Sequence, residues 1–228
     1  MLLKKWEDLP EYMRNNEVRA YYNKLKKKKL TLLAKRFFDI ICSLILLIIM
    51  SPIMFFFAIW IKCDSNGPVF YRQERVTQYG KLFRIYKFRT MIIDADKKGT
   101  LVTLDKDPRI TKVGTKIRKY RIDEIPQLIN VLKGEMSFVG TRPEVKKYVD
   151  KYTKEMYATL LLPAGITSNA SIEFKNEDEM LNGAEDVDKV YIEKVLPEKM
   201  KWNLEDIKKY HFFREVIICF KTVIGVIK

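Results

Sequence analysis

The stretch IICSLILLIIMSPIMFFFAIWI, residues 40–61, contains no charged side chain over 22 residues. Apolar runs of about 18 residues or more are typical of membrane segments, because roughly 20 helical residues cross a bilayer core. The run is too long and too far from the N-terminus for a secretory signal peptide. It therefore predicts a membrane helix, and a buried core helix is the alternative.

Basic residues lie on both sides of this apolar run. They are Lys24, Lys26, Lys27, Lys28, Lys29, Lys35 and Arg36 before it, and Lys62, Arg72, Arg75, Lys81, Arg84, Lys87 and Arg89 after it. The positive-inside rule therefore favours the cytoplasm for both ends. Ser51 and Pro52 lie in the middle, where proline kinks a helix, and each half is about 17 Å long. We predict a re-entrant helix kinked at Ser51-Pro52, and a tilted single-pass helix is the alternative.

The composition narrows the class of partner. The 228 residues include 43 Lys and Arg against 29 Asp and Glu, a net charge of +14, which favours nucleic acid, lipid headgroups or phosphorylated substrates. Cys42, Cys63 and Cys219 lack paired spacing, so a disulfide framework or a zinc site is not indicated. The single histidine, His211, argues against a Ser-His-Asp triad, and neither a P-loop nor a GxGxxG motif is present.

The predicted fold is α+β and mainly α, with a re-entrant membrane helix, a small cytoplasmic catalytic domain and amphipathic interfacial helices. We expect a basic N-terminal arm at 1–33, the membrane helix at 34–62 and the catalytic domain at 63–228. Residues 18–33 mix aromatic and lysine residues at helical spacing, which suits either an interfacial helix on anionic lipid or a solvated helix.

Within the catalytic domain, alternating apolar and polar residues predict short strands or a hairpin, and periodic apolar residues predict helices. The expected elements are strands at 69–76 and 82–91, helices at 123–134 and 144–161, a loop at 161–172 and an apolar helix at 204–227, either core or membrane-surface.

Two adjacent carboxylates, Asp123 and Glu124, stand in KYRIDEIPQL, residues 119–128. One interpretation is helix N-capping, which the helix dipole favours. The other is a reaction site, because an ionised carboxylate can attack phosphorus and a second one can bind Mg²⁺ together with substrate phosphates. The candidate phosphate-binding residues are Lys87, Arg89, Arg118 and Arg142.

Several motifs occur in an order that resembles a known family. They are KRFFDI at 35–40, the apolar run with Ser51-Pro52, GPVFYRQER at 67–75, LFRIYKFRTM at 82–91, the block DPRITKVGTKIRKYRIDEIPQLINVLKGEMSFVGTRPE at 107–144 and GIT at 165–167. From about residue 33 onward the chain resembles the bacterial sugar transferases, also called monotopic phosphoglycosyl transferases.

The resemblance implies a reaction. Such enzymes move a sugar 1-phosphate from a UDP-sugar to undecaprenyl phosphate, releasing UMP, as the first membrane step of capsule, exopolysaccharide, O-antigen or glycoprotein glycan synthesis. It implies that Asp123 forms a covalent phosphosugar intermediate, that Glu124, with Asp123, binds Mg²⁺, and that Arg118 and Arg142 bind phosphate. It also implies the membrane lipid as a partner and a monotopic location on the cytoplasmic face of the bacterial inner membrane. A homodimer is compatible with it, and nucleic acid is not expected.

The chain departs from the family pattern at three places. Thr141 replaces the first proline of Gly-Pro-Arg-Pro, Thr77 replaces a common glycine, and PAGITSNAS at 163–171 differs from the usual Pro-Gly-Ile-Thr-Gly. The last departure bears on the choice of sugar. Two other functions stay open: a membrane-tethered nucleic-acid-binding protein, which would not need the acidic pair, and an inactive assembly scaffold, against which the intact pair argues.

Overall fold

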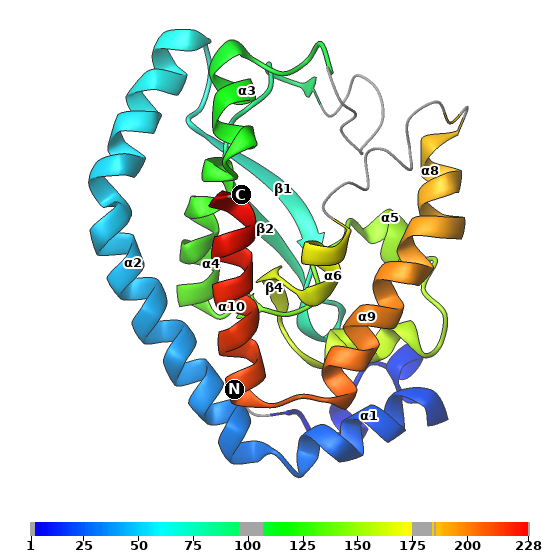
Figure 1. Ribbon diagram of the computed structural model, residues 1–228. Helices are drawn as coiled ribbons and strands as arrows, with labels where there is room; N and C mark the ends of the chain where they lie inside the picture. Colours follow the sequence, from blue (N-terminus) through cyan, green and yellow to red (C-terminus); the bar gives the residue numbers. More distant parts are fainter. Residues whose placement is uncertain (1–2, 96–106, 175–183, 185, 228) are drawn as a thin grey trace.

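The longest element of the computed structural model is helix α2, Lys29–Asp64, which forms one edge of the molecule (Figure 1). By length and composition it is the one helix, within the described part of the chain, that could cross a membrane, and only 6% of its most apolar window is buried. The helix continues through Pro52, and the Ser51 hydroxyl donates a hydrogen bond to the Ile48 carbonyl at 2.8 Å. It is bowed but does not reverse its direction, so the kinked hairpin stays a prediction.

The structure describes residues 3–95, 107–174, 184 and 186–227. The α-helices besides α2 are α1 (Asn16–Lys26), α3 (Lys112–Lys119), α4 (Leu128–Lys133), α5 (Lys146–Val149), α6 (Asn169–Glu173), α8 (Val187–Val190), α9 (Leu196–Lys208) and α10 (Phe212–Ile227). Short 3-10 turns occur at Trp6–Asp8, Glu11–Met13, Gln78–Gly80, Ile122–Gln127 and Met156–Leu161, and Tyr191–Val195 is a π-helical turn.

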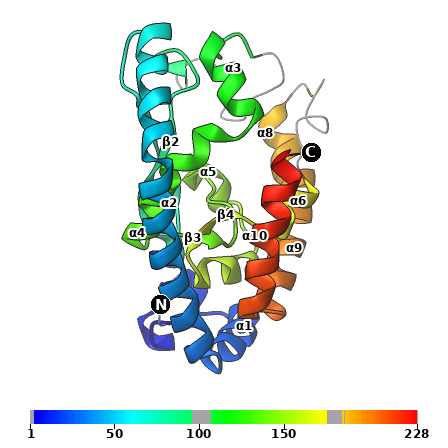
Figure 2. The same ribbon diagram turned by 60° about the vertical axis from the view of Figure 1, so that its left-hand side comes forward.

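Two small sheets organise the part of the chain that follows α2. Strands β1 (Phe70–Val76) and β2 (Leu82–Phe88) pair antiparallel, which confirms the predicted hairpin. Strands β3 (Met136–Val139) and β4 (Ala164–Thr167) pair in parallel, so the loop predicted at 161–172 is wrong. Figure 2 shows β3 and β4 between α2 on one side and α9 and α10 on the other.

Both ends of α2 contact the same folded unit. Near its start, Arg36 donates to the carbonyls of Val131 and Leu132 at 2.7 and 2.9 Å, and so caps α4. Asp39 accepts a hydrogen bond from the Ser137 hydroxyl at 2.7 Å, which ties the same turn to β3. Near its end, Ile61 packs into an apolar cluster with side chains of β2 and α3, which are Phe88, Val113 and Ile117. The middle of α2 is largely exposed.

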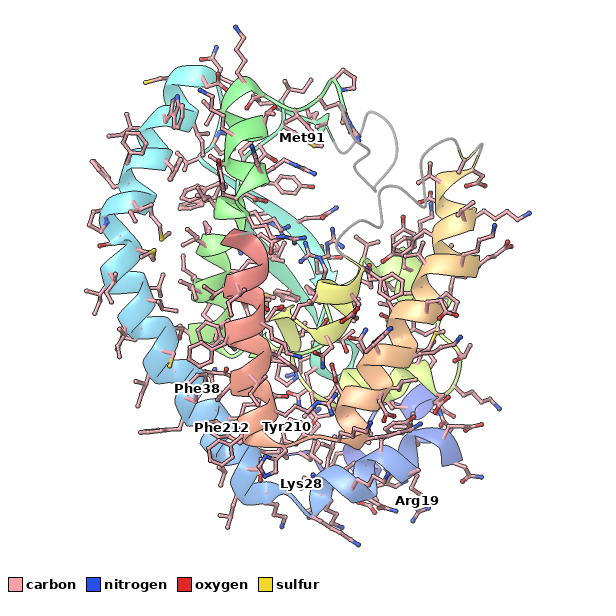
Figure 3. All side chains as sticks on the ribbon, viewed as in Figure 1. Arg19, Lys28, Phe38, Met91, Tyr210 and Phe212 are labelled. Carbon is pink, nitrogen blue, oxygen red and sulfur yellow. The ribbon has the colours of Figure 1, made fainter. Side chains whose placement is uncertain are left out.

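Helix α10 joins this arrangement through polar and aromatic contacts at the start of α2. Lys35 forms an ion pair with Glu215, and the rings of Phe38 and Phe212 meet edge to face at 5.6 Å. Figure 3 shows Lys28 and Tyr210 at the same junction, where the Lys28 ammonium donates to the Tyr210 carbonyl. The chain therefore turns between α9 and α10, and the single helix predicted at 204–227 is wrong.

The predicted helix at 144–161 is also wrong. The chain leaves the helical path after α5 and returns in the 3-10 turn Met156–Leu161. Tyr148, Tyr152 and Leu161 are all buried in the main core cluster, and burial of these apolar side chains favours the path that the chain takes here. The predicted helix at 123–134 starts as a 3-10 turn and becomes α-helical at Leu128, and Gly134 ends it with a φ of 82°.

The basic N-terminal arm packs into the main core. Met13, Val18 and Leu25 are fully buried and share one hydrophobic cluster with side chains of α9 and the 3-10 turn Met156–Leu161. The apolar face of α1 packs against this cluster, and the lysines of α1 lie on its exposed face.

We expect Met13→Ala to cost about 2–5 kcal/mol of stability, because it removes a fully buried side chain from a packed core. The unfolding free energy in detergent measures this, with the exposed Glu11→Ala as the control. Equal stability of the two variants would mean that the arm does not pack as described.

Candidate active site

The carboxylate pair Asp123–Glu124 lies in the 3-10 turn Ile122–Gln127, between α3 and α4. Arg121, directly before it, has a left-handed backbone with a φ of 52°, which is uncommon for a residue other than glycine and is often found at functional sites. No side chain caps the start of the 3-10 turn Ile122–Gln127 or the start of α4, so the capping interpretation of the pair is wrong.

Glu124 is held by two cations. Its Oε1 accepts from Arg142 Nη2 at 2.7 Å and from Lys87 Nζ at 3.1 Å, whereas its Oε2 accepts from Arg142 Nη1 at the longer distance of 3.5 Å. Burial opposes ionisation of this carboxyl, but the charges of Arg142 and Lys87 outweigh it and hold the pKa of Glu124 well below its usual range. Glu124 is therefore ionised at physiological pH.

Asp123 has a different environment, although it is the adjacent residue. It is 9% exposed, and within the described part of the chain no hydrogen bond or ion pair reaches its carboxylate. Burial raises the pKa of Asp123, the charge of Lys87 opposes this rise, and the charge of Glu124 adds to it. A carboxylate without a paired cation keeps its lone pairs available, which is what a nucleophile requires.

Each site cation comes from a different element. Lys87 is on β2, against which the turn Ile122–Gln127 packs, and burial lowers its pKa while the Glu124 charge raises it. Arg118 lies in the last turn of α3, and its charge favours the ionised form of Asp123. Arg142 follows β3 and is brought to Glu124 by the loop at 140–144.

The start of that loop depends on two glycines in backbone contact. A Cβ on Gly165 would lie 2.1 Å from the Gly140 nitrogen, and a Cβ on Gly140 would lie 2.6 Å from the Pro163 carbonyl oxygen. Gly140 N–H donates to the Thr167 carbonyl at 3.0 Å, and Gly165 N–H donates to the Thr141 carbonyl at 2.9 Å. Thr141, the departure from the family pattern, thus keeps the loop anchored through its backbone.

The structure brings Lys87, Arg118 and Arg142 to the pair but places Arg89 elsewhere. Arg89 is buried and donates to the carbonyls of Ser65 and Asn66 at 2.6 and 2.7 Å, so it closes the C-terminal end of α2. The predicted kink residues, Ser51 and Pro52, lie on the exposed middle of α2.

Arg75 is a site cation that the sequence analysis did not select. Its guanidinium lies close enough to Arg142 and Glu144 for their charges to act on its pKa, which burial lowers. Its Nη1 donates to the Pro143 carbonyl at 3.2 Å, next to Arg142. The only sequence signal was its place in GPVFYRQER, one of the motifs of the resemblance.

The oxygen donors present fit Mg²⁺ only together with a substrate. Within the described residues, no group of three or more His, Cys, Asp or Glu side chains could hold a metal. The pair Asp123–Glu124 supplies two carboxylates, with Glu124 Oε2 only weakly engaged. Mg²⁺ typically binds one or two carboxylates, and substrate phosphates and water complete its six oxygens.

Comparison with known proteins identifies the family. Residues 30–228 match the model of the bacterial sugar transferases. The chain belongs to this family. The match begins after α1, so most of the N-terminal arm lies outside the shared bacterial sugar transferase unit.

Three relatives carry related activities in their names. A UDP-N-acetylgalactosamine-undecaprenyl-phosphate N-acetylgalactosaminephosphotransferase of Aeromonas hydrophila is 39% identical over 83% of this chain and 42% of the relative. An undecaprenyl-phosphate galactose phosphotransferase of Salmonella typhimurium is 40% identical over 68% and 35%. A UDP-glucose:undecaprenyl-phosphate glucose-1-phosphate transferase of Escherichia coli K12 is 34% identical over 84% and 39%. The chain thus spans about two fifths of the length of these bacterial sugar transferases.

Proposed function

We propose that the chain is a phosphoglycosyl transferase that moves a sugar 1-phosphate from a UDP-sugar to undecaprenyl phosphate. The observation that carries the proposal is the unequal environment of two adjacent carboxylates: Lys87 and Arg142 hold Glu124, while Asp123 is buried and has no ion pair with any described residue. Surrounding cations suit a diphosphate, and the relatives are named for this class of reaction. Because these relatives are named for three different sugars, the proposal leaves the sugar unspecified.

The proposed chemistry has two steps. An Asp123 carboxylate oxygen attacks the β-phosphorus of the UDP-sugar, a P–O bond to this oxygen forms, and the P–O bond to the UMP oxygen breaks with its electron pair. An oxygen of undecaprenyl phosphate then attacks the same phosphorus, and the Asp123 carboxylate leaves in its original form. Arg118 and Arg142 stabilise the charge that develops on the phosphoryl oxygens in both steps.

Asp123 and Glu124 are proposed to hold Mg²⁺ together with the donor diphosphate. The ion would neutralise phosphate charge and help UMP to leave. Glu124 is suited to this role because its low pKa keeps it ionised, while Lys87 and Arg142 fix its orientation.

The proposed location is the cytoplasmic face of the bacterial inner membrane, with α2 entering and leaving by the same leaflet. Support comes from the contacts of α2: both of its ends contact one folded unit, and its middle is exposed and apolar. A helix that crossed the bilayer would have to hold that unit on both sides of the membrane. The basic residues flanking α2 favour the cytoplasmic side.

We expect cysteines introduced by Lys27→Cys and Lys62→Cys, at exposed sites near the two ends of α2, to react with a membrane-impermeant thiol reagent from the same side. The measurement uses oriented vesicles of a chain in which Cys42, Cys63 and Cys219 are replaced. Labelling of the two sites from opposite sides would contradict the monotopic placement and favour a single-pass helix.

The direct test of the proposed function is UMP release from a panel of UDP-sugars in the presence of undecaprenyl phosphate and Mg²⁺. We expect one or a few sugars to give UMP and a lipid-linked product. An absence of UMP with every donor, for a folded chain in lipid, would overturn the proposed function.

A further inference from the structure

A buried ionic cluster lies behind the loop that carries Arg142. Glu144 and Lys199 are 6% and 5% exposed, and their charged groups are 3.9 Å apart. The Tyr191 hydroxyl lies between them: it donates to Glu144 Oε1 at 2.6 Å and accepts from Lys199 Nζ at 3.2 Å. The hydroxyl therefore bridges a buried carboxylate to a buried ammonium, and charge-assisted hydrogen bonds of this kind are strong at low dielectric.

Glu144 is close to the site along the chain and in space. It is two residues after Arg142, whose guanidinium holds Glu124 at 2.7 Å. Its carbonyl accepts from Val76 N–H at 2.9 Å, and its charge opposes the lowering of the Arg75 pKa by burial. The backbone on the β1 side and the carboxylate on the α9 side thus fix this end of the loop.

Tyr191 reaches this cluster from an unusual element. It is the first residue of the π-helical turn Tyr191–Val195, which connects α8 to α9. Single π-helical turns within helices are rare and are found frequently at functional sites. The ring of Tyr148 packs on that of Tyr191 at 4.7 Å, so the position of the Tyr191 ring is set by packing as well as by its hydroxyl.

We propose that Tyr191 and Lys199 are positioning residues that hold Glu144 in place. Through the loop at 140–144, they thereby position the Arg142 guanidinium toward the donor diphosphate and set the affinity for the donor. This inference rests on the proposed function. The Tyr191 hydroxyl holds the Glu144 carboxylate in one position. Without this hydroxyl the buried carboxylate is left with an unsatisfied oxygen, which is costly, so a shift toward another donor is favoured. Because Arg142 is only two residues away, that shift moves its guanidinium, and the site loses part of its phosphate binding.

The test compares Tyr191→Phe with Tyr148→Phe. Both remove one hydroxyl and keep the ring packing, but the Tyr148 hydroxyl bonds to Asp188, which is not part of the cluster. We expect Tyr191→Phe to raise the KM for the UDP-sugar about three- to tenfold and to lower kcat as well, because Arg142 also acts in the transition state, and Tyr148→Phe to leave both unchanged. Equal effects of the two variants on KM would mean a purely structural role and would overturn the proposal.

A double-mutant cycle with Arg142→Ala tests the route of the effect. If Tyr191 acts through Arg142, Tyr191→Phe has no further effect on UDP affinity in the Arg142→Ala background, whereas independent effects would multiply. Calorimetric binding of UDP measures the cycle separately from turnover. If the wild-type chain binds UDP but releases no UMP, the proposed function fails and the cycle still decides the inference. Multiplying effects with normal wild-type turnover would overturn the inference alone, and a chain that neither binds UDP nor turns over would overturn both.

Discussion

Asp123→Asn is expected to reduce turnover on the order of 10⁴-fold, because the amide keeps the shape of the side chain but lacks the nucleophilic oxygen. The fold is expected to survive. Within the described part of the chain no hydrogen bond or ion pair reaches this carboxylate, so the substitution breaks none there. The measurement is UMP release in lipid, with Asp150→Asn, an exposed carboxylate paired to Lys146, as the control.

The stability of this variant separates a catalytic role from a structural one. Burial raises the pKa of Asp123 in the folded state, so its ionised form opposes folding as the pH rises through that pKa. A neutral amide does not have this cost, and the melting temperature of Asp123→Asn at neutral pH should equal or exceed that of the wild type. An inactive variant that is also markedly less stable would point to a structural role for Asp123.

Glu124→Gln is expected to lower turnover about 10²- to 10³-fold and to raise the Mg²⁺ concentration needed for half-maximal activity. The amide removes the counter-charge of Lys87, whose pKa burial already lowers, and it loosens Arg142. The measurement is a Mg²⁺ titration of UMP release after removal of metal with chelator. The exposed Glu74→Gln on β1 is the matched control.

Two outcomes would contradict this account of Glu124. Full turnover of the wild type in excess chelator would remove the metal from the mechanism. An unchanged Mg²⁺ requirement in Glu124→Gln, with turnover reduced, would restrict Glu124 to holding Lys87 and Arg142.

The parts of the fold that follow from local pattern could be predicted from the sequence. The hairpin β1–β2 follows from two short runs of mixed apolar and polar residues on either side of a turn, and α2 follows from an uncharged run of 22 residues. The β3–β4 pair could not be predicted in this way, because its strands have four residues each and pair across a long stretch of chain. The break after α5 could not be predicted either, since periodicity does not reveal which core a buried tyrosine joins.

The site too could be predicted only in part from the sequence. The pair Asp123–Glu124 stands out as adjacent carboxylates in a basic chain, but only the three-dimensional contacts separate the paired Glu124 from the unpaired Asp123. Arg89 was selected for its type and place in a motif, yet it closes the end of α2. Arg75 was missed because the local sequence around an arginine in a basic strand does not show which residues lie near it in the folded protein.

The most direct test of the central claim is to trap the enzyme-bound intermediate. The purified chain is incubated with Mg²⁺ and a UDP-sugar labelled in the sugar, without lipid acceptor, and then precipitated with acid. The account predicts that label stays on the wild-type protein, that hydroxylamine releases it as it does an acyl phosphate, and that Asp123→Asn carries none. Equal label on Asp123→Asn, or an unlabelled wild type that nevertheless turns over when lipid is added, would contradict a covalent step at Asp123.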